Sequence, residues 1–352
     1  MYIYIAYFLI LFFFIQYKNN KVIFYYACSL LLLLLAVKNI NVGADSGPYI
    51  RDFTAFALGH AKEVTKYQTE PIWRWIAQIV VFFKGSYVSF QLILFIITFL
   101  PVIYVIQKNS KNYLLSVFFF FSFFYYLNTY CIVRQAMAIS FLLLCYSFIK
   151  DHKLLPAILF FVIAVLCHNL AFLGILAFVF YWKKFPLRLI YILLAVSFIF
   201  GLILNQGMLF FLPQKIRDYF LWPGHGFRKT LAPYTALIGI MNLTYITCLL
   251  RGSKESKESF WTQTVFLGLV VLNSTQKLVL GIRLSQFFMI TQIIFWTNYI
   301  EEKQDKKTLY KIGLIIYSST YFFALLIRDS IGIVPYEFIP QIQKFLHYVN
   351  NL

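Results

Sequence analysis

The chain has 352 residues, of which 61% are hydrophobic, 21% aromatic and only 12% charged. A soluble protein carries roughly twice that charged fraction, so the composition excludes an ordinary soluble domain. The net charge of +18 would suit a nucleic-acid-binding protein. The basic residues, however, lie in short stretches between apolar runs, and we therefore expect no nucleic-acid partner.

Apolar runs recur along the chain, many of them of the length that a helix needs to cross a hydrocarbon core of ~30 Å. They do not alternate as the strands of a membrane barrel do. The sequence therefore predicts an all-α polytopic membrane protein, with about twelve transmembrane helices in a single integral membrane domain over 1–352. The predicted spans are 2–16, 22–37, 86–106, 113–128, 131–149, 154–168, 170–182, 188–205, 233–250, 260–276, 279–299 and 309–327.

Short basic loops separate these spans, and their sequences are "YKNNK", "QKNSK", "KDHK", "WKKFPLR", "RGSKESKES" and "EEKQDKK". With twelve spans, all six loops fall on the same side, and with Lys311 they hold sixteen of the thirty-one Lys and Arg residues. Short loops rich in Lys and Arg mark the cytoplasmic face. The segments 38–85, 206–232 and 328–352 are then external, and their apolar and aromatic residues suit interfacial helices.

The unusual polar residues collect near the external ends of the predicted spans. They are Asp45, Glu70, Arg134, His168 and Arg283. Charges at membrane depth indicate a functional site by default, whereas an ion pathway would need them at mid-membrane, where these spans hold almost none. Because a guanidinium can donate two parallel hydrogen bonds to phosphate, the arginines favour a site for an anionic, lipid-borne substrate.

Each of these residues also has a purely structural interpretation. Arg134 could extend to the interface from near a helix end, although the small residues of "AMAIS" that follow it favour packing inside a bundle. His168 could end the helix before it. Asp45 could be a turn or N-cap residue, and Glu70, just before Pro71, suits the start of a helix.

Taken together, the motifs resemble those of the EpsG/Wzy-type polysaccharide polymerases. The matching segments are "VGADSGPY" with Asp45 and Tyr49, "EPIW" with Glu70, "VRQAMAIS" with Arg134 and Gln135, "CHNLAF" with His168, "GIRLSQFF" with Arg283, and "IVPYEF" near the C-terminus. Two departures are visible, since Ala44, beside Asp45, stands where a hydroxyl residue is common, and phenylalanines follow Arg283 where a tyrosine is expected.

The resemblance implies a GT-C-like fold and a glycosyltransferase of the bacterial inner membrane. Such an enzyme transfers an undecaprenyl-pyrophosphate-linked glycan onto a new lipid-linked repeat unit at the outer face, without a metal or another cofactor. The products of the family are O-antigen, capsule or exopolysaccharide. The implied partners are the lipid-linked oligosaccharide, membrane lipid and a chain-length regulator protein.

The transfer is a substitution at an anomeric carbon, and the pyrophosphate that leaves needs its charge neutralised. The substrate-binding candidates are Arg134, Gln135, Arg283 and Tyr49. The acceptor hydroxyl needs a base, and the catalytic candidates are His168, Glu70 and Asp45. His168 has the most suitable unperturbed pKa, but the residues alone do not decide among the three.

Two other classes of function share some of these features. A transporter or flippase of lipid-linked glycans would carry cations through the membrane depth and internal repeats, which this sequence lacks. A membrane acyltransferase that modifies surface sugars would also place His and Arg near one face. The order of the motifs along the chain favours the polymerase.

Overall fold

The computed structural model describes residues 1–60, 70–211, 214, 217–218, 226–228, 232–303 and 307–340. Every regular element in these residues is helical, and two isolated β-bridges join Lys38 to Phe338 and Phe227 to Leu278. The elements are α1 (Tyr2–Phe14), η1 (Ile15–Tyr17), α2 (Lys21–Ala36), α3 (Ser46–Ala57), α5 (Pro71–Phe82), α6 (Tyr87–Asn109), α7 (Tyr113–Ser122), α8 (Tyr125–Asn128), α9 (Val133–Lys150), α10 (Leu154–Cys167), η2 (Asn169–Phe178), α11 (Val179–Trp182), α12 (Leu187–Ile203), η3 (Gln206–Phe211), α14 (Ala232–Arg251), α15 (Lys254–Lys257), α16 (Phe260–Ser274), α17 (Gly281–Met289), α18 (Gln292–Glu302) and α19 (Lys307–Arg328).

The chain divides into two compact units. Unit 1 comprises Met1–Phe148, Leu154–Phe172 and Trp296–Leu352, and unit 2 comprises Ile149–Lys153 and Leu173–Phe295.

Among the residues that the structure describes, four helices are long and apolar enough to cross a membrane, namely α6, α9, α14 and α19, and eight shorter apolar helical segments accompany them. The 22 residues of α19 extend about 33 Å, slightly more than a hydrocarbon core. The predicted all-helical fold of a multi-pass membrane protein is therefore confirmed.

Two predicted spans are not continuous helices. The span 113–128 breaks at Phe124, whose φ of 67° lies in the left-handed region that a right-handed helix cannot continue through. The span 279–299 divides into α17 and α18, where tight bonds such as that from Thr291 N to Phe288 O (3.1 Å) replace the α-helical pattern. The predicted span 170–182 begins as the 3₁₀ helix η2.

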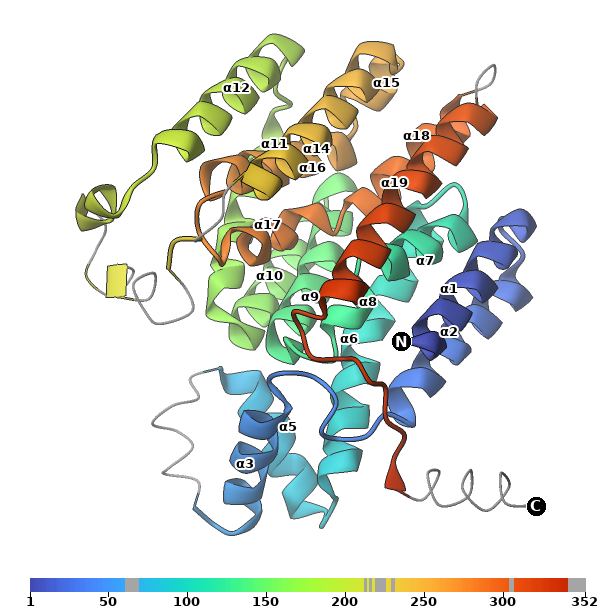
Figure 1. Ribbon diagram of the computed structural model, residues 1–352, viewed down its shortest axis with the longest axis vertical. Helices are drawn as coiled ribbons and strands as arrows, with labels where there is room; N and C mark the ends of the chain where they lie inside the picture. Colours follow the sequence, from blue (N-terminus) through green and yellow to red (C-terminus); the bar gives the residue numbers. More distant parts are fainter. Residues whose placement is uncertain are drawn as a thin grey trace. The chain divides into compact units, whose positions relative to one another are not determined.

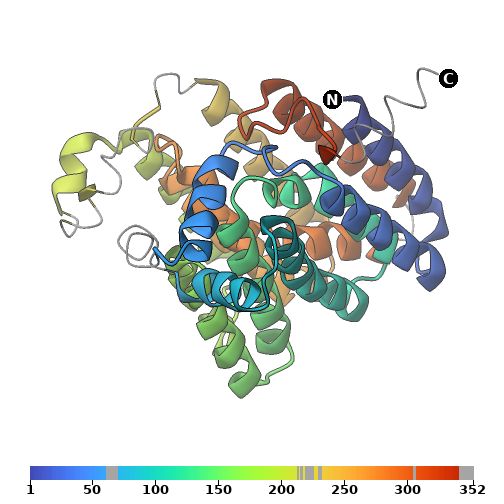
Figure 2. The same ribbon diagram turned by 90° about the horizontal axis from the view of Figure 1, so that it is seen from below.

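Within the described part of the predicted external segment 38–85, the helices α3 and α5 lie beside each other and beside α6 (Figures 1 and 2). The buried face of α3 carries Tyr49, Phe53 and Phe56 together with Asp52. Residues 61–69 of this segment, much of 206–232 and residues 341–352 lie outside the described residues.

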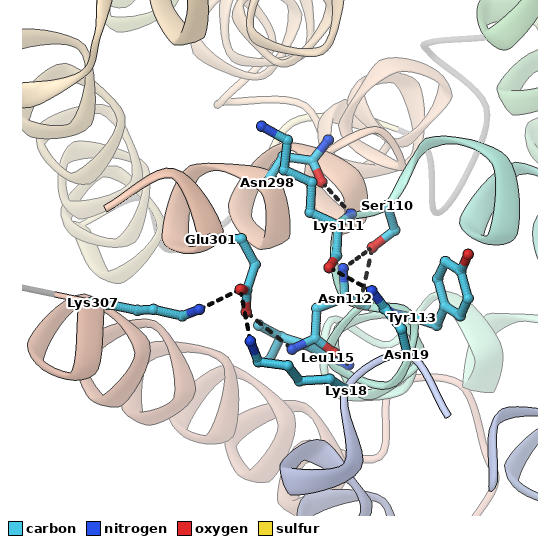
Figure 3. Close-up of polar contacts among 10 residues, drawn as sticks. All are labelled: Lys18, Asn19, Ser110, Lys111, Asn112, Tyr113, Leu115, Asn298, Glu301 and Lys307. Atoms are coloured by element: carbon cyan, nitrogen blue, oxygen red, sulfur yellow. Dashed lines mark hydrogen bonds and ion pairs between the residues drawn. The ribbon is translucent and has the colours of Figure 1, made fainter. Parts of the chain in front are cut away.

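In unit 1, three of the predicted cytoplasmic loops meet around Glu301 at the end of α18 (Figure 3). Its carboxylate accepts hydrogen bonds from Lys307 and from Asn112 Nδ2 (3.1 Å), and Lys18 Nζ lies 3.6 Å away. Lys111 Nζ pairs with the neighbouring Glu302 at 3.0 Å. Lys18, Lys111 and Lys307, one from each of three predicted cytoplasmic loops, therefore lie at one end of unit 1, as the shared charge of these loops predicts.

At the ends of α2 and α19 that are away from Glu301, the segments that follow the two helices pair with each other. After α19, the segment 331–339 pairs with 37–44, through Gly43 N to Gly332 O (2.9 Å) and Ile339 N to Val37 O (2.9 Å). Gly43 has a φ of +112°, and a Cβ there would lie 2.3 Å from the carbonyl oxygen of Tyr130. Glycine thus lets the loop before α3 rest directly on the turn before α9.

Lys38 fixes this loop from inside. Its side chain is buried, and Nζ donates to the carbonyl oxygens of Asn39 (3.1 Å) and Val42 (2.9 Å) and lies 5.6 Å from the ring centroid of Tyr130. Burial lowers the pKa of Lys38 to about 7. This role could not be inferred from the sequence, because a lysine directly after an apolar run resembles an ordinary interfacial residue.

In unit 2, buried polar side chains join α12, α14 and α16. Asn273 Nδ2 donates to Ser197 Oγ (3.1 Å), and Asn242 Nδ2 donates to Asn273 Oδ1 (2.7 Å). Beside this network α12 approaches α16 so closely that a Cβ on Gly201 would lie 1.8 Å from the carbonyl oxygen of Asn273. Small residues allow such approaches between membrane helices.

We predict that Gly201→Ala separates α12 from α16 and lowers the melting temperature of the detergent-solubilised protein, at a cost of about 1–3 kcal/mol. The matched control is Gly239→Ala on α14, where a Cβ meets nothing within 4 Å and alanine has the better helix propensity. A Gly201→Ala protein as stable as the Gly239→Ala protein would contradict the close approach.

We predict that Lys38 makes the free energy of unfolding increase as the pH rises above 7. The unfolded chain keeps a proton on this lysine up to about pH 10.4, whereas the folded chain releases it near pH 7. Unfolding therefore takes up a proton between these values, and stability rises by about 2 kcal/mol from pH 7 to pH 9. Thermal melts of the wild type and of Lys38→Met across this range measure the difference. Parallel pH profiles for the two proteins would refute the buried neutral lysine.

Candidate functional site

Glu70 is the centre of the candidate site. It is the N-cap residue of α5, and Pro71 occupies the first helical position, as the sequence indicates. Its side chain makes no capping hydrogen bond and is only 8% exposed. The carboxylate is therefore directed into unit 1 and not used to start the helix.

Two residues from other elements share this carboxylate. Arg134, the second residue of α9, donates from Nη1 to Glu70 Oε2 at 2.5 Å. His168, directly after α10, places Nδ1 3.0 Å from Glu70 Oε1. The packing of α5 against α10 brings the two ends together. The two carboxylate oxygens of Glu70 thus bind Arg134, which is 64 positions away in the sequence, and His168, which is 98 positions away.

Glu70 is ionised in this setting. Burial acts to raise the pKa of Glu70, but the hydrogen bond with His168 and the charge of Arg134 outweigh it, so that the pKa lies below its ordinary value. Because an ionised carboxylate can only accept hydrogen bonds, Nδ1–H of His168 donates to Glu70 Oε1. In the neutral imidazole the unprotonated nitrogen is then Nε2.

Tyr49 on α3 also contacts the guanidinium of Arg134. Its ring centroid lies 5.4 Å from the guanidinium carbon, and its hydroxyl is hydrogen-bonded to Arg134. Burial raises the pKa of Tyr49, the charge of Arg134 opposes this rise and the charge of Asp45 adds to it. The phenol therefore stays neutral and can donate a hydrogen bond.

The remaining candidates of unit 1 lie beside this cluster. Asp45 is the half-buried N-cap residue of α3 and makes no side-chain capping bond. Gln135 follows Arg134 on α9 and is buried. Trp73 on α5, with its ring centroid 6.2 Å from that of Tyr49, is fully buried. Its indole Nε1 has no hydrogen-bond partner among the described residues.

The cluster lies at the helix ends that are farthest from the basic loops. Arg134 begins α9 and Lys150 ends it, which separates them by about 24 Å along the helix. His168 likewise follows the end of α10, whose start adjoins the predicted loop 150–153. The site and the basic loops therefore mark opposite ends of these helices.

Arg283 belongs to unit 2, where it lies half-buried in the first turn of α17. The turn before α17 is bonded to residues of another predicted external segment, since Arg228 N donates to Lys277 O (2.8 Å) and Arg228 Nη2 to Val279 O (3.1 Å). Arg228 is thus a further cation near this helix, and its place could not be inferred from the sequence because the pairing joins segments 49 residues apart.

Within the described ranges, no group of three or more His, Cys, Asp and Glu residues is arranged to hold a metal ion. The cluster offers a carboxylate, an imidazole, a guanidinium and a phenol. This set can bind an anion, orient a base and donate hydrogen bonds to hydroxyl groups.

Comparisons with known proteins agree with these features. The model of the EpsG family matches residues 21–338, a range that includes every candidate residue from Asp45 to Arg283. Neither curated proteins nor solved structures gave a match. The chain therefore belongs to the EpsG family, the family of Wzy-type polysaccharide polymerases.

Proposed function

We propose that the protein is a glycosyltransferase that polymerises a bacterial surface polysaccharide. It transfers a glycan from undecaprenyl pyrophosphate onto the next lipid-linked repeat unit, at the outer face of the inner membrane. The observation that carries the proposal is the Glu70 carboxylate, which holds a guanidinium and an imidazole together. The family membership supports the class of reaction.

In the proposed reaction an acceptor sugar hydroxyl attacks the anomeric carbon of the growing glycan. A bond forms between the acceptor oxygen and this carbon, and the bond from the carbon to the pyrophosphate oxygen breaks. His168 Nε2 takes the proton of the acceptor hydroxyl, and Glu70 keeps Nδ1 protonated and stabilises the imidazolium that forms. Glu70 thus acts as the positioning residue and His168 as the base.

Arg134 binds the leaving pyrophosphate in this scheme. Its guanidinium is planar and always charged, and its paired N–H groups match the geometry of phosphate oxygens. Tyr49 fixes its plane. Interactions with the pyrophosphate that strengthen as charge develops on the leaving oxygen lower the barrier.

Charge balance calls for a second cation. The negative charge of Glu70 cancels the positive charge of Arg134. The cluster of Glu70, Arg134 and His168 therefore has a net positive charge only when His168 is protonated. A pyrophosphate diester carries about two negative charges at neutral pH. We therefore propose that the pyrophosphate needs a second cation, and Arg283 is the residue that the sequence predicts for this role. Asp45 and Gln135 then hydrogen-bond sugar hydroxyls of the acceptor or donor.

The predicted topology completes the proposal. About twelve helical passages in a GT-C-like arrangement would put the basic loops in the cytoplasm and the site outside. The meeting of three basic loops at the Glu301 end of unit 1, away from Glu70, supports this orientation. A chain-length regulator is the expected protein partner.

The function is tested by reconstituting the protein with a synthetic undecaprenyl-pyrophosphate oligosaccharide. We predict a ladder of longer lipid-linked products and a loss of at least 10²-fold in kcat/KM for Arg134→Ala, because a donor to the leaving group is removed. Arg134→Lys keeps the charge pair with Glu70 but loses the planar fork, and it should be folded and strongly impaired.

The control is Arg51→Ala, on the exposed side of α3, where the arginine side chain is 77% exposed. It should retain wild-type rates. Elongation by Arg134→Ala at the wild-type rate would exclude the pyrophosphate assignment. Movement of the lipid-linked glycan across the bilayer without any elongation would instead identify a transporter.

A further inference from the structure

Unit 2 contains a pocket of about 500 Å³ that the proposed function does not use. It lies where the turn between α11 and α12 meets α15 and the start of α16. Its lining residues are Lys184, Phe185, Pro186, Leu187, Lys254, Lys257 and Glu258. The two contributing loops, "WKKFPLR" and "RGSKESKES", are both among the predicted cytoplasmic ones.

Hydrogen bonds to residues of α16 hold the backbone beside the pocket. Gln263, fully buried on α16, clamps the backbone of Phe185 in both directions, accepting from its N–H and donating to its carbonyl oxygen, each at 3.2 Å. On the other wall, Thr262 Oγ1 donates to the carbonyl oxygen of Ser256 at 2.5 Å. The backbone next to Lys184 and Lys257 is therefore held in place by the fold of unit 2.

The charge of the pocket is not compensated from within the protein. Three lysines and one glutamate give its lining a net formal charge of +2. Within the part of the chain that the structure describes, no salt bridge pairs Lys184, Lys254 or Lys257 with an acidic side chain, Glu258 included. A lining that combines uncompensated lysines with the apolar residues Phe185, Pro186 and Leu187 favours an anionic ligand that also has an apolar part.

The surroundings of the pocket indicate the source of this ligand. Trp182, two residues before Lys184, is 71% exposed, as aromatic residues of the membrane interface are. Beyond the pocket, Ile192 and Val196 on α12 and Leu250 on α14 are exposed apolar residues. A headgroup in the pocket would place acyl chains along such surfaces, whereas a soluble phosphate would make no use of them.

We propose that this pocket binds the phosphate headgroup of an anionic phospholipid. The lysines pair with the phosphodiester, and Phe185, Pro186 and Leu187 contact the glycerol and the first acyl carbons. Basic pockets between transmembrane helices on the cytoplasmic side have this chemistry. The inference goes beyond the proposed polymerase, and its test reads lipid binding and not elongation, so that either can fail alone.

The test titrates the full-length protein in detergent with phosphatidylglycerol, and with phosphatidylcholine as the zwitterionic comparison, and counts bound lipid by native mass spectrometry. We expect tighter binding of phosphatidylglycerol, weakened about fivefold for each lysine changed in Lys184→Gln, Lys254→Gln and Lys257→Gln. Glu258→Gln should act in the opposite direction and tighten binding, a result that a folding defect would not produce.

The matched control is Lys153→Gln, which removes one exposed positive charge of unit 2 outside the pocket and should leave binding unchanged. Equal binding of the two lipids, or equal losses in Lys153→Gln and Lys257→Gln, would overturn the proposal. Displacement of the lipid by inorganic phosphate or glycerol phosphate at matched ionic strength would show that the pocket takes a soluble phosphate, and would overturn the lipid assignment.

Discussion

The candidate site depends on one carboxylate that serves two partners. Glu70 has little exposure, and an unpaired carboxylate there would be costly, since breaking a buried ion pair costs ~3–5 kcal/mol. Arg134 and His168 satisfy one oxygen each. The same contacts fix the plane of the guanidinium and the tautomer of the imidazole. Stability and the proposed chemistry therefore use the same atoms, and neither α9 nor α10 can shift its end near Glu70 without disturbing both.

The two ends of unit 1 are chemically different. One end gathers lysines of three loops around Glu301 (Figure 3). The other end gathers the Glu70 cluster, the loop before α3 and the C-terminal segment 331–339. A helix bundle with cations at one end and an enclosed polar cluster at the other has a built-in direction across a membrane. This asymmetry is the physical basis for placing the proposed transfer on the outer face.

The sequence predicted the helical class well, because apolar run length is set by the bilayer itself. It predicted that Asp45, Glu70, Arg134, His168 and Arg283 gather near the external ends of the spans, since charges near membrane-helix ends are few. The structure brings Glu70, Arg134 and His168 into direct contact. The sequence could not predict that Glu70 is the shared partner, because that depends on the packing of α5 against α10. Nor could it predict the break at Phe124 or the burial of Lys38, whose causes are a left-handed backbone and a tertiary cage of carbonyl groups.

The central claim is that Glu70 acts through His168. A double-mutant cycle of the elongation rate tests it, using Glu70→Gln, His168→Ala and the combined variant, with their melting temperatures recorded alongside. If Glu70 orients the base, each single change lowers the rate by 10²-fold or more, and the combined variant is little slower than His168→Ala alone. Losses that multiply in the combined variant would contradict the account, because they would show that the two residues act independently.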